Sequence, residues 1–297
     1  MLPRVQATLI VNPNASAVST EVQARLAAEL GRAYELTVAE TERPLHAAEL
    51  ARAAGDRTLF VYGGDGLLNE AVNGAARGAT IAILPGGGKN VVARTLGIPL
   101  DPLEAARALV AASPRRISLG RANDRRFVFA AGLGFDAELV RRVDALGRRA
   151  DGRRPGDAAF VREAVGILAA RRGHYEPELE IEGLGRAAFA FVGNGGPYSY
   201  VGSRPLRVAP EARFELGLDL VAPTRVTAAA IPRLLAYAFR GHGQEAAADV
   251  LYAHDVDSIS IRCDRPLPLQ VDGEDLGDVA AVRFEAERDA VAVLAPG

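Results

Sequence analysis

A glycine-rich turn that carries one carboxylate is the first feature of the sequence that could do chemistry. Residues 61–70 read Val-Tyr-Gly-Gly-Asp-Gly-Leu-Leu-Asn-Glu, so an apolar strand pattern ends, glycines surround Asp65, and a helical pattern begins. Glycines let a backbone approach phosphate closely, and a helix N-terminus offers N–H groups. A carboxylate beside phosphates needs a cation or a proton in transfer. Asp65 is therefore a candidate magnesium ligand or proton acceptor. No structural need for it is evident, so we expect Asp65→Asn to fold normally.

A second glycine-rich turn follows the next strand pattern. Residues 83–90 read Ile-Leu-Pro-Gly-Gly-Gly-Lys-Asn, and they lack the spacing of a Walker loop. Turns at the carboxyl ends of strands in one parallel sheet converge on one crevice. Lys89 is the only lysine in the chain. We expect its ammonium group to contact phosphate, although chance would also explain a single lysine in an arginine-rich sequence.

A third motif, Asp272-Gly273-Glu274, follows an apolar strand pattern near the C-terminus. It offers two carboxylates around a glycine. An Asp-Gly hairpin tip in solvent explains the same residues equally well.

The elements around these motifs predict two domains. Strand and helix patterns alternate over residues 1–116, which predicts a nucleotide-binding α/β domain built on a parallel sheet. Residues 117–287 show mostly strand patterns, among them 127–130, 187–192, 258–261, 267–271 and 279–284, with few helices. This region predicts a β-sandwich domain. The final residues 288–297 could return to the first domain.

Composition and charge exclude several classes of protein. The 297 residues carry a net charge of −2, so no overall field attracts nucleic acid, and the single Cys263 excludes an intramolecular disulfide. No run approaches the roughly 20 apolar residues of a membrane span. We expect a cytoplasmic protein. Residues 141–172 hold nine arginines and four acidic residues, a basic stretch that could contact anionic lipid or be a solvated face.

The order and spacing of the three motifs resemble the catalytic domain shared by diacylglycerol kinases, sphingosine kinases and bacterial lipid kinases. Further matches are Asn12-Pro13, Thr41, His46-Ala47, the Gly-Leu-Gly-Phe-Asp-Ala segment at 132–137, Asn194-Gly195, and Pro210-Glu211-Ala212. The resemblance covers nearly the whole chain. It implies a nucleotide domain, a lipid-holding β-sandwich, ATP and Mg²⁺ as cofactors, and a role in phospholipid biosynthesis.

The resemblance also implies a role for individual residues. Glu274 is the expected base for the substrate hydroxyl, with Asp65 as the second choice, and Asp219 and Asp272 are expected to help bind metal. The expected nucleotide-binding residues are Asn12, Thr41, Gly63, Gly64, Asp65, Gly66, Leu67, Leu68, Asn69, Gly86, Gly87, Gly88, Lys89 and Asn90. The substrate would be a lipid at the inner membrane face, diacylglycerol first and a sphingoid base next. Homodimerisation is compatible with the sequence.

Some positions depart from the family pattern. Gly88 stands where the family has threonine, and Val91 and Leu216 stand where it has aspartate. These departures leave open a catalytically weak regulator that binds nucleotide or lipid. A soluble-substrate kinase of the NAD kinase and phosphofructokinase fold is another alternative, because Gly-Gly-Asp-Gly also occurs there. The Asp-Gly-Glu and Phe-Asp-Ala motifs argue against that second alternative.

Overall fold

A computed structural model describes residues 4–147 and 155–296 of the chain. The chain divides into two compact units, residues 1–118 with 289–297, and residues 119–288. Four arginines of the basic stretch, at positions 148, 149, 153 and 154, lie outside the described residues. Among the described residues, no helix is long and apolar enough to cross a membrane.

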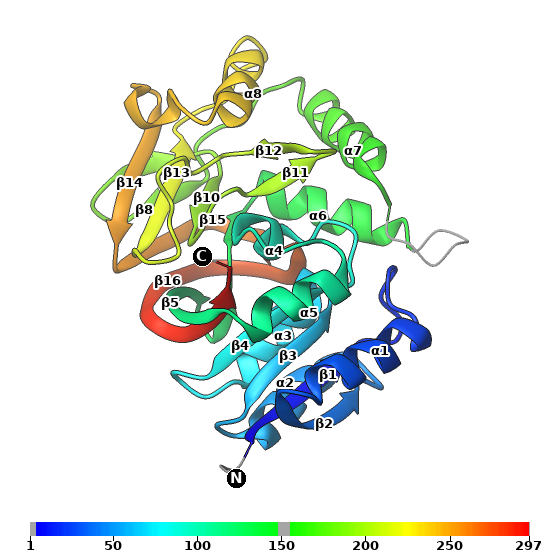
Figure 1. The fold of residues 1–297 in the computed structure, drawn as a ribbon. Coiled ribbons are helices and arrows are strands. Elements are labelled where there is room, and N and C mark those ends of the chain that lie inside the picture. Colours follow the sequence, from blue (N-terminus) through cyan, green and yellow to red (C-terminus); the bar gives the residue numbers. More distant parts are fainter. Residues whose placement is uncertain (1–3, 148–154, 297) are drawn as a thin grey trace. The chain divides into compact units, whose positions relative to one another are not determined.

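The first unit contains a parallel sheet with strand order β4–β3–β1–β2 (Figure 1). The final residues of β16 (Glu274–Ala295) pair in parallel with the other side of β4, through Ala292 and Thr80. Strands β3 and β4 are buried along almost their whole length, whereas the edge strand β2 is largely exposed. Continuous apolar strands are typical of a sheet covered on both faces. The elements are β1 Val5–Val11, α1 Thr20–Leu30, β2 Tyr34–Glu40, α2 His46–Ala54, β3 Thr58–Gly63, α3 Asp65–Gly74, β4 Thr80–Pro85, α4 Val91–Thr95 and α5 Pro102–Val110.

Two helix pairs, α1 with α5 and α2 with α3, cover this sheet. Right-handed crossovers place them on opposite faces, because the chain moves from β1 to β2 in one direction and from β2 to β3 in the other. Local sequence signals define the helix ends. The Ser19 hydroxyl accepts a hydrogen bond from the backbone N–H of Val22, and the Asp101 carboxylate caps α5 in the same way. Gly74 allows α2 and α3 to meet, since a Cβ there would lie 1.8 Å from the Ala48 carbonyl oxygen.

The second unit is rich in antiparallel strands, with the order β14–β13–β10–β7–β15–β16. Its largest apolar cluster is built from strand residues such as Phe127, Val192, Leu220 and Phe284. The elements are β6 Arg125–Phe127, β7 Ala130–Leu133, α6 Phe135–Ala145, α7 Asp157–Ala170, β8 Leu179–Ile181, β9 Gly185–Ala187, β10 Ala190–Gly193, β11 Ser199–Val201, β12 Arg204–Leu206, β13 Leu218–Pro223, α8 Ile231–Arg240, a 3₁₀ helix Gln244–Ala246, β14 Val250–Val256 and β15 Ser258–Val271. Strands β5 Ser113–Ala122 and β16 Glu274–Ala295 each continue across the boundary between the units.

The predicted fold class is confirmed, with parallel strands in the N-terminal part and a strand-rich C-terminal part. Several strand predictions were wrong in detail. The single strand predicted at 127–130 is split between β6 and β7, and the one at 187–192 between β9 and β10. Conversely, 258–261 and 267–271 belong to one long strand, β15, whose register shifts mark irregular pairing with β16. Such irregularities depend on the partner strand, so the local pattern does not predict them.

Candidate active site

The carboxyl ends of the four neighbouring strands of the first unit bring the predicted nucleotide-binding residues together. Val11 pairs with Glu40 and with Tyr62, and Gly63 pairs with Pro85, so the strands end at nearly the same level. The backbone N–H of Thr41 donates to the Val11 carbonyl at 2.8 Å, and that of Asn12 donates to the Tyr62 carbonyl at 3.2 Å. The residues that follow the strands therefore form one continuous edge, where parallel sheets commonly bind ligands.

The two glycine-rich turns touch one another at this edge. The Gly86 N–H donates to the Gly63 carbonyl at 2.8 Å. A Cβ on Gly87 would lie 2.5 Å from the Gly64 Cα, which no ordinary contact permits. A Cβ on Gly88, in contrast, would meet nothing within 4 Å. Gly86 and Gly87 thus allow the backbone of the second turn to approach that of the first, whereas Gly88 lies open to solvent.

Asp65 has a structural role that the sequence did not reveal. Its carboxylate accepts hydrogen bonds from the N–H of Val91 at 3.0 Å and of Val92 at 3.3 Å, and so caps α4 from the other turn. Burial raises the pKa of Asp65, while these N–H donors and the charge of Arg94 act in the opposite direction. The expectation that the turn has no need of this carboxylate was wrong. Asp65 joins the two turns, a contact between residues 26 positions apart that no local pattern contains.

Asn90 shapes the second turn from within. It has a left-handed backbone conformation, with a φ of 49°. Its side-chain oxygen accepts from the Gly87 N–H at 3.0 Å, and its amide donates to the Gly87 carbonyl at 2.8 Å. Lys89 lies half-buried between Asn90 and the exposed Gly88. The side chain of Asn90 therefore closes the turn that presents Lys89.

Three other predicted nucleotide-binding residues, on α3, have buried side chains. Leu67 and Leu68 on α3 are 6% and 3% exposed, and Asn69 is fully buried. Their side chains belong to the core, which leaves their backbone as the part that could face a ligand. The N-cap residue of α3 is Gly64, which has no side chain that could cap the helix. The N–H groups of the first turn of α3 are thus the local donors suited to an anion.

In the second unit, Asp272 and Gly273 form the hairpin turn between β15 and β16. Both have positive φ, 48° and 82°, as a type I′ turn requires. The turn is not a solvated tip, because Asp272 is 6% exposed and its carboxylate accepts from the backbone N–H groups of Val128, Phe129 and Ala130 at 2.6–3.1 Å. These bonds occupy the break between β6 and β7. They hold the turn that carries Glu274, whose carboxylate contacts Arg125 at 2.8 Å.

Asp219 belongs to a separate cluster on β13. It is fully buried, and one carboxylate oxygen contacts the His254 imidazole Nδ1 at 2.8 Å and accepts from the Asp255 N–H at 3.1 Å. Burial raises the pKa of Asp219, while the His254 and Asp255 contacts lower it. His254 was not predicted as a functional residue, since its contact with Asp219 depends on the pairing of β13 with β14.

These carboxylates do not fit a magnesium ion bound within the second unit. Strands β10 and β7 lie between β13 and β15, so Asp219 and Asp272 are roughly 14 Å apart at the usual strand spacing. Each is already held by its own donors, and the described residues contain no cluster of three metal-ligating side chains. A magnesium ligand role for Asp219 and Asp272 stays a prediction that this geometry does not support.

Comparison with known proteins finds a family model that matches the first part of the chain. The family model of the diacylglycerol kinase catalytic domain matches residues 6–122. The glycine-rich turns, Asp65 and the strands that carry them all lie within these matched residues.

Individual relatives extend the comparison. The chain is 41% identical to a YegS-like probable lipid kinase of Pseudomonas aeruginosa over 138 residues, which are 44% of this chain and 45% of that protein. It is 38% identical to a diacylglycerol kinase of Bacillus subtilis over 99 residues, 32% of this chain and 33% of the relative. The matches thus span less than half the length of these curated relatives.

The similarity in fold extends further than the sequence similarity. A crystal structure of a diacylglycerol kinase from Bacillus anthracis strain Sterne matches 98% of this chain and 96% of its own, with a TM-score of 0.72 and 20% identity. At 20% identity the match concerns the fold alone, and it covers both units of the chain.

Proposed function

We propose that this protein is an ATP-dependent lipid kinase that transfers the γ-phosphoryl group of MgATP to a lipid hydroxyl. The observation that carries the proposal is the contact between the two glycine-rich turns at the carboxyl edge of the sheet, with Gly86 bound to Gly63 and Asp65 capping α4. Paired backbone turns of this kind suit a polyphosphate. The family of residues 6–122 and the names of the relatives support a lipid acceptor.

The proposed assignment gives each part of the edge a task. N–H groups of the first turn of α3 and of Gly88 bind phosphate oxygens, Lys89 adds a cation, and Thr41 and Asn12 border the nucleoside end. Asp65 positions the turns, because its carboxylate is committed to the N–H groups of Val91 and Val92. The magnesium ion arrives with the nucleotide as part of the substrate.

Glu274 is the proposed base. The acceptor hydroxyl attacks the γ-phosphorus, the bond from that phosphorus to the ADP oxygen breaks, and the hydroxyl proton passes to the carboxylate. Phosphoryl transfer depends mainly on positioning and charge stabilisation. Asp272 supports this role indirectly, since its three backbone hydrogen bonds fix the turn, and Arg125 orients the Glu274 carboxylate.

Diacylglycerol is the proposed acceptor, ahead of a sphingoid base, and the proposed place of action is the cytoplasmic membrane surface, with residues 141–172 as the contact. Incubation with γ-labelled ATP and a panel of diacylglycerol, sphingosine and NAD tests the assignment. Label in a lipid product supports it. Label in NAD alone, or ATP binding without turnover on any acceptor, would replace it with the soluble-substrate kinase or the regulator.

A further inference from the structure

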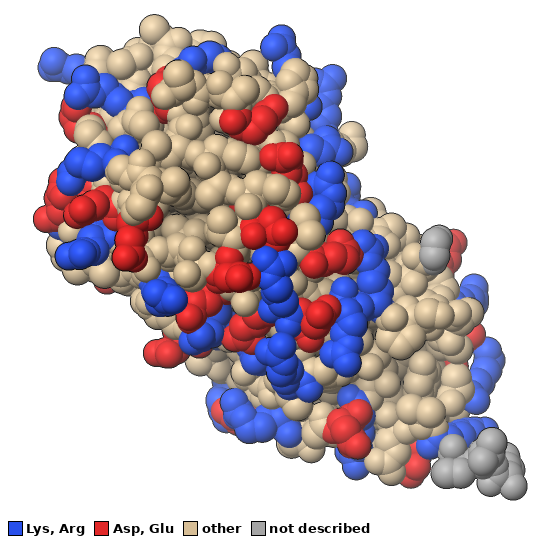
Figure 2. Space-filling model, turned by 90° about the vertical axis from the view of Figure 1, so that its left-hand side faces the viewer, with Lys and Arg blue, Asp and Glu red and all other residues tan. Residues whose placement is uncertain are grey.

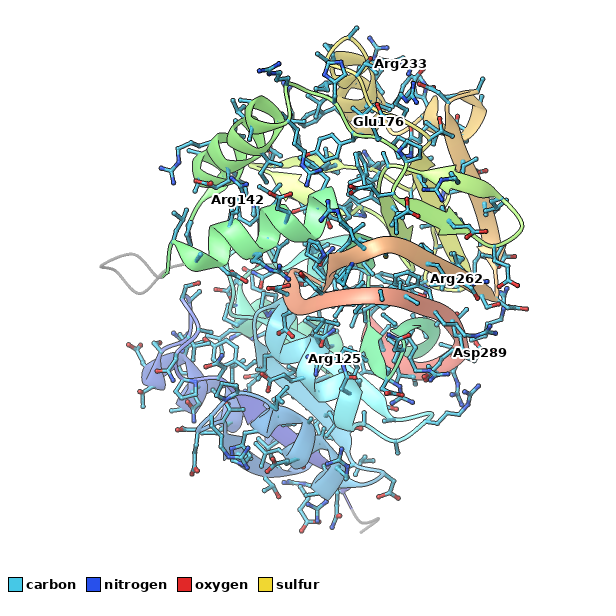
Figure 3. All side chains as sticks on the ribbon, turned by 180° about the vertical axis from the view of Figure 1, so that it is seen from behind. Arg125, Arg142, Glu176, Arg233, Arg262 and Asp289 are labelled. Carbon is cyan, nitrogen blue, oxygen red and sulfur yellow. The ribbon has the colours of Figure 1, made fainter. Side chains whose placement is uncertain are left out.

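A hollow on the second unit lies apart from the residues assigned above to nucleotide binding and to proton transfer. Its volume is about 360 Å³, and it is lined by α6, by the segment after α7, and by β15. Phe135, Ala188 and Leu267 contribute apolar side chains to the lining, and Arg142, Arg171 and Arg265 contribute guanidinium groups. Figure 3 labels Arg142 on α6. An apolar lining beside cationic groups suits a ligand with an organic part and an anionic part.

The arginines of this hollow are not equally neutralised. Arg265 forms a two-bond contact with Glu178, at 3.0 and 2.8 Å, and Arg141 contacts both Asp275 and Asp278. Glu138, in contrast, is shared by two arginines, Arg142 at 2.7 Å and Arg171 at 3.4 Å. One carboxylate thus faces two guanidinium groups. The surplus positive charge lies at Arg142 and Arg171.

A buried hydroxyl beside these arginines lacks a partner. Tyr175 lines the hollow and is 4% exposed, and its hydroxyl makes no hydrogen bond within the described residues. Its ring packs edge-to-face on Phe135 and Phe189, with the Arg171 guanidinium 4.7 Å from the ring centre. A buried hydroxyl without a partner destabilises the fold, and a phenylalanine would pack equally well without that penalty. The hydroxyl therefore indicates a partner that the protein itself does not supply.

We propose that this hollow binds a phosphate ester, with the phosphate held by Arg142, Arg171 and the Tyr175 hydroxyl, and the organic part against Phe135 and Leu267. Guanidinium groups match phosphate oxygens in geometry and charge. The volume exceeds that of inorganic phosphate and falls in the range of small organic ligands. The site is additional to the proposed nucleotide edge, which lies in the other unit.

Binding measurements on the full chain test this site and separate two sources of the phosphate. Equilibrium dialysis with glycerol 3-phosphate probes a soluble ester, and sedimentation with phosphatidylcholine vesicles, with and without phosphatidic acid, probes a lipid headgroup. Saturable binding to either probe supports the site and identifies the source. Arg171→Gln should weaken it at least about tenfold, the scale of one charge-assisted hydrogen bond of about 1.4 kcal/mol.

Tyr175→Phe is the sharper variant, because it removes only the oxygen. It should weaken binding about three- to tenfold while leaving the melting temperature of the unliganded protein unchanged or higher. Arg162→Gln on α7 is the matched control, since Arg162 is exposed, pairs with Glu163 and does not line the hollow. No binding to either probe, or equal loss in Arg162→Gln and Arg171→Gln, would overturn the proposal.

Discussion

At the scale of single residues, Asp65 is expected to contribute both to turnover and to the stability of the fold. Asp65→Asn keeps the size of the side chain but puts an amide where one of the Val91 and Val92 N–H groups donates. We predict at least about a hundredfold loss in kcat, the scale of a positioned polar group. The lost cap should also lower the free energy of unfolding by about 1 kcal/mol. Steady-state kinetics and thermal unfolding measure both effects.

A matched control for this variant is Asp56→Asn, because Asp56 is exposed and has no part in the proposed site. It should behave like the wild type in both assays. Near wild-type turnover of Asp65→Asn would contradict its assignment to the site, and unchanged stability would contradict the capping role.

Lys89 is the second residue whose role can be isolated. We expect its ammonium to contact the β- or γ-phosphate. Lys89→Arg should then raise the KM for ATP, because the longer planar guanidinium fits a tight turn poorly. Lys89→Ala should raise the KM further, because it removes the cation. Gly88→Thr in the alanine background should restore part of the affinity. The Gly88 backbone permits this change, since its φ is not positive and a Cβ there meets nothing within 4 Å. Unchanged kcat and KM in Lys89→Ala would show that this lysine is incidental.

At the scale of elements, contact between the two turns is the feature to test. Gly87→Ala places a Cβ 2.5 Å from the Gly64 Cα and must force the turns apart. We predict a rise of at least tenfold in the KM for ATP, and a much smaller change for Gly88→Ala, which adds the same methyl group one residue away. Nucleotide affinity measured by calorimetry checks both variants. Equal effects would show that the close approach of the turns is unimportant for ATP.

A buried polar network joins α6 to β15 in the second unit. Asp136 accepts hydrogen bonds from Tyr198 and from Gln270, and it is 5% exposed. Burial raises the pKa of Asp136 to about 6, although the two hydrogen bonds lower it in part. The pKa of an aspartate in an unfolded chain is near 4. Between these values the native state binds more protons than the unfolded state.

Stability must therefore fall as pH rises through this window. The contribution of Asp136 is fully present below about pH 4 and is lost as pH rises through 6, and it amounts to at most about 3 kcal/mol. Asp136→Asn removes the titration. The free energy of unfolding of the wild type, minus that of the variant, should decrease between pH 4 and pH 7.5 in denaturant titrations. A constant or increasing difference would contradict the raised pKa.

Local sequence signals predicted much of the first unit and less of the second. The alternation of strand and helix patterns over residues 1–116 predicted the α/β arrangement of the first unit, because such patterns depend on neighbours in the chain. The capping role of Asp65 and the binding of Asp272 to the break between β6 and β7 join residues far apart in sequence. Strand β14 also escaped prediction, since its exposed and half-buried residues show no clear alternation.

At the scale of the whole molecule, the chain passes between its two units within β5 and again within β16. The proposed nucleotide edge belongs to one unit and the proposed base, Glu274, to the other. Acidic and basic side chains lie close together on the face drawn in Figure 2, in keeping with the net charge of −2 and with arginine–carboxylate pairs such as Arg126 with Glu287.

The most direct test of the proposed function is transfer of γ-labelled phosphate from ATP to diacylglycerol in mixed micelles, measured for the wild type and for Glu274→Gln together. We predict labelled lipid with the wild type. With Glu274→Gln we predict a loss of at least about a hundredfold in kcat and little change in the KM for ATP, because the base acts on the acceptor and not on the nucleotide. No labelled lipid with the wild type, or equal turnover by the two proteins, would contradict the proposed function.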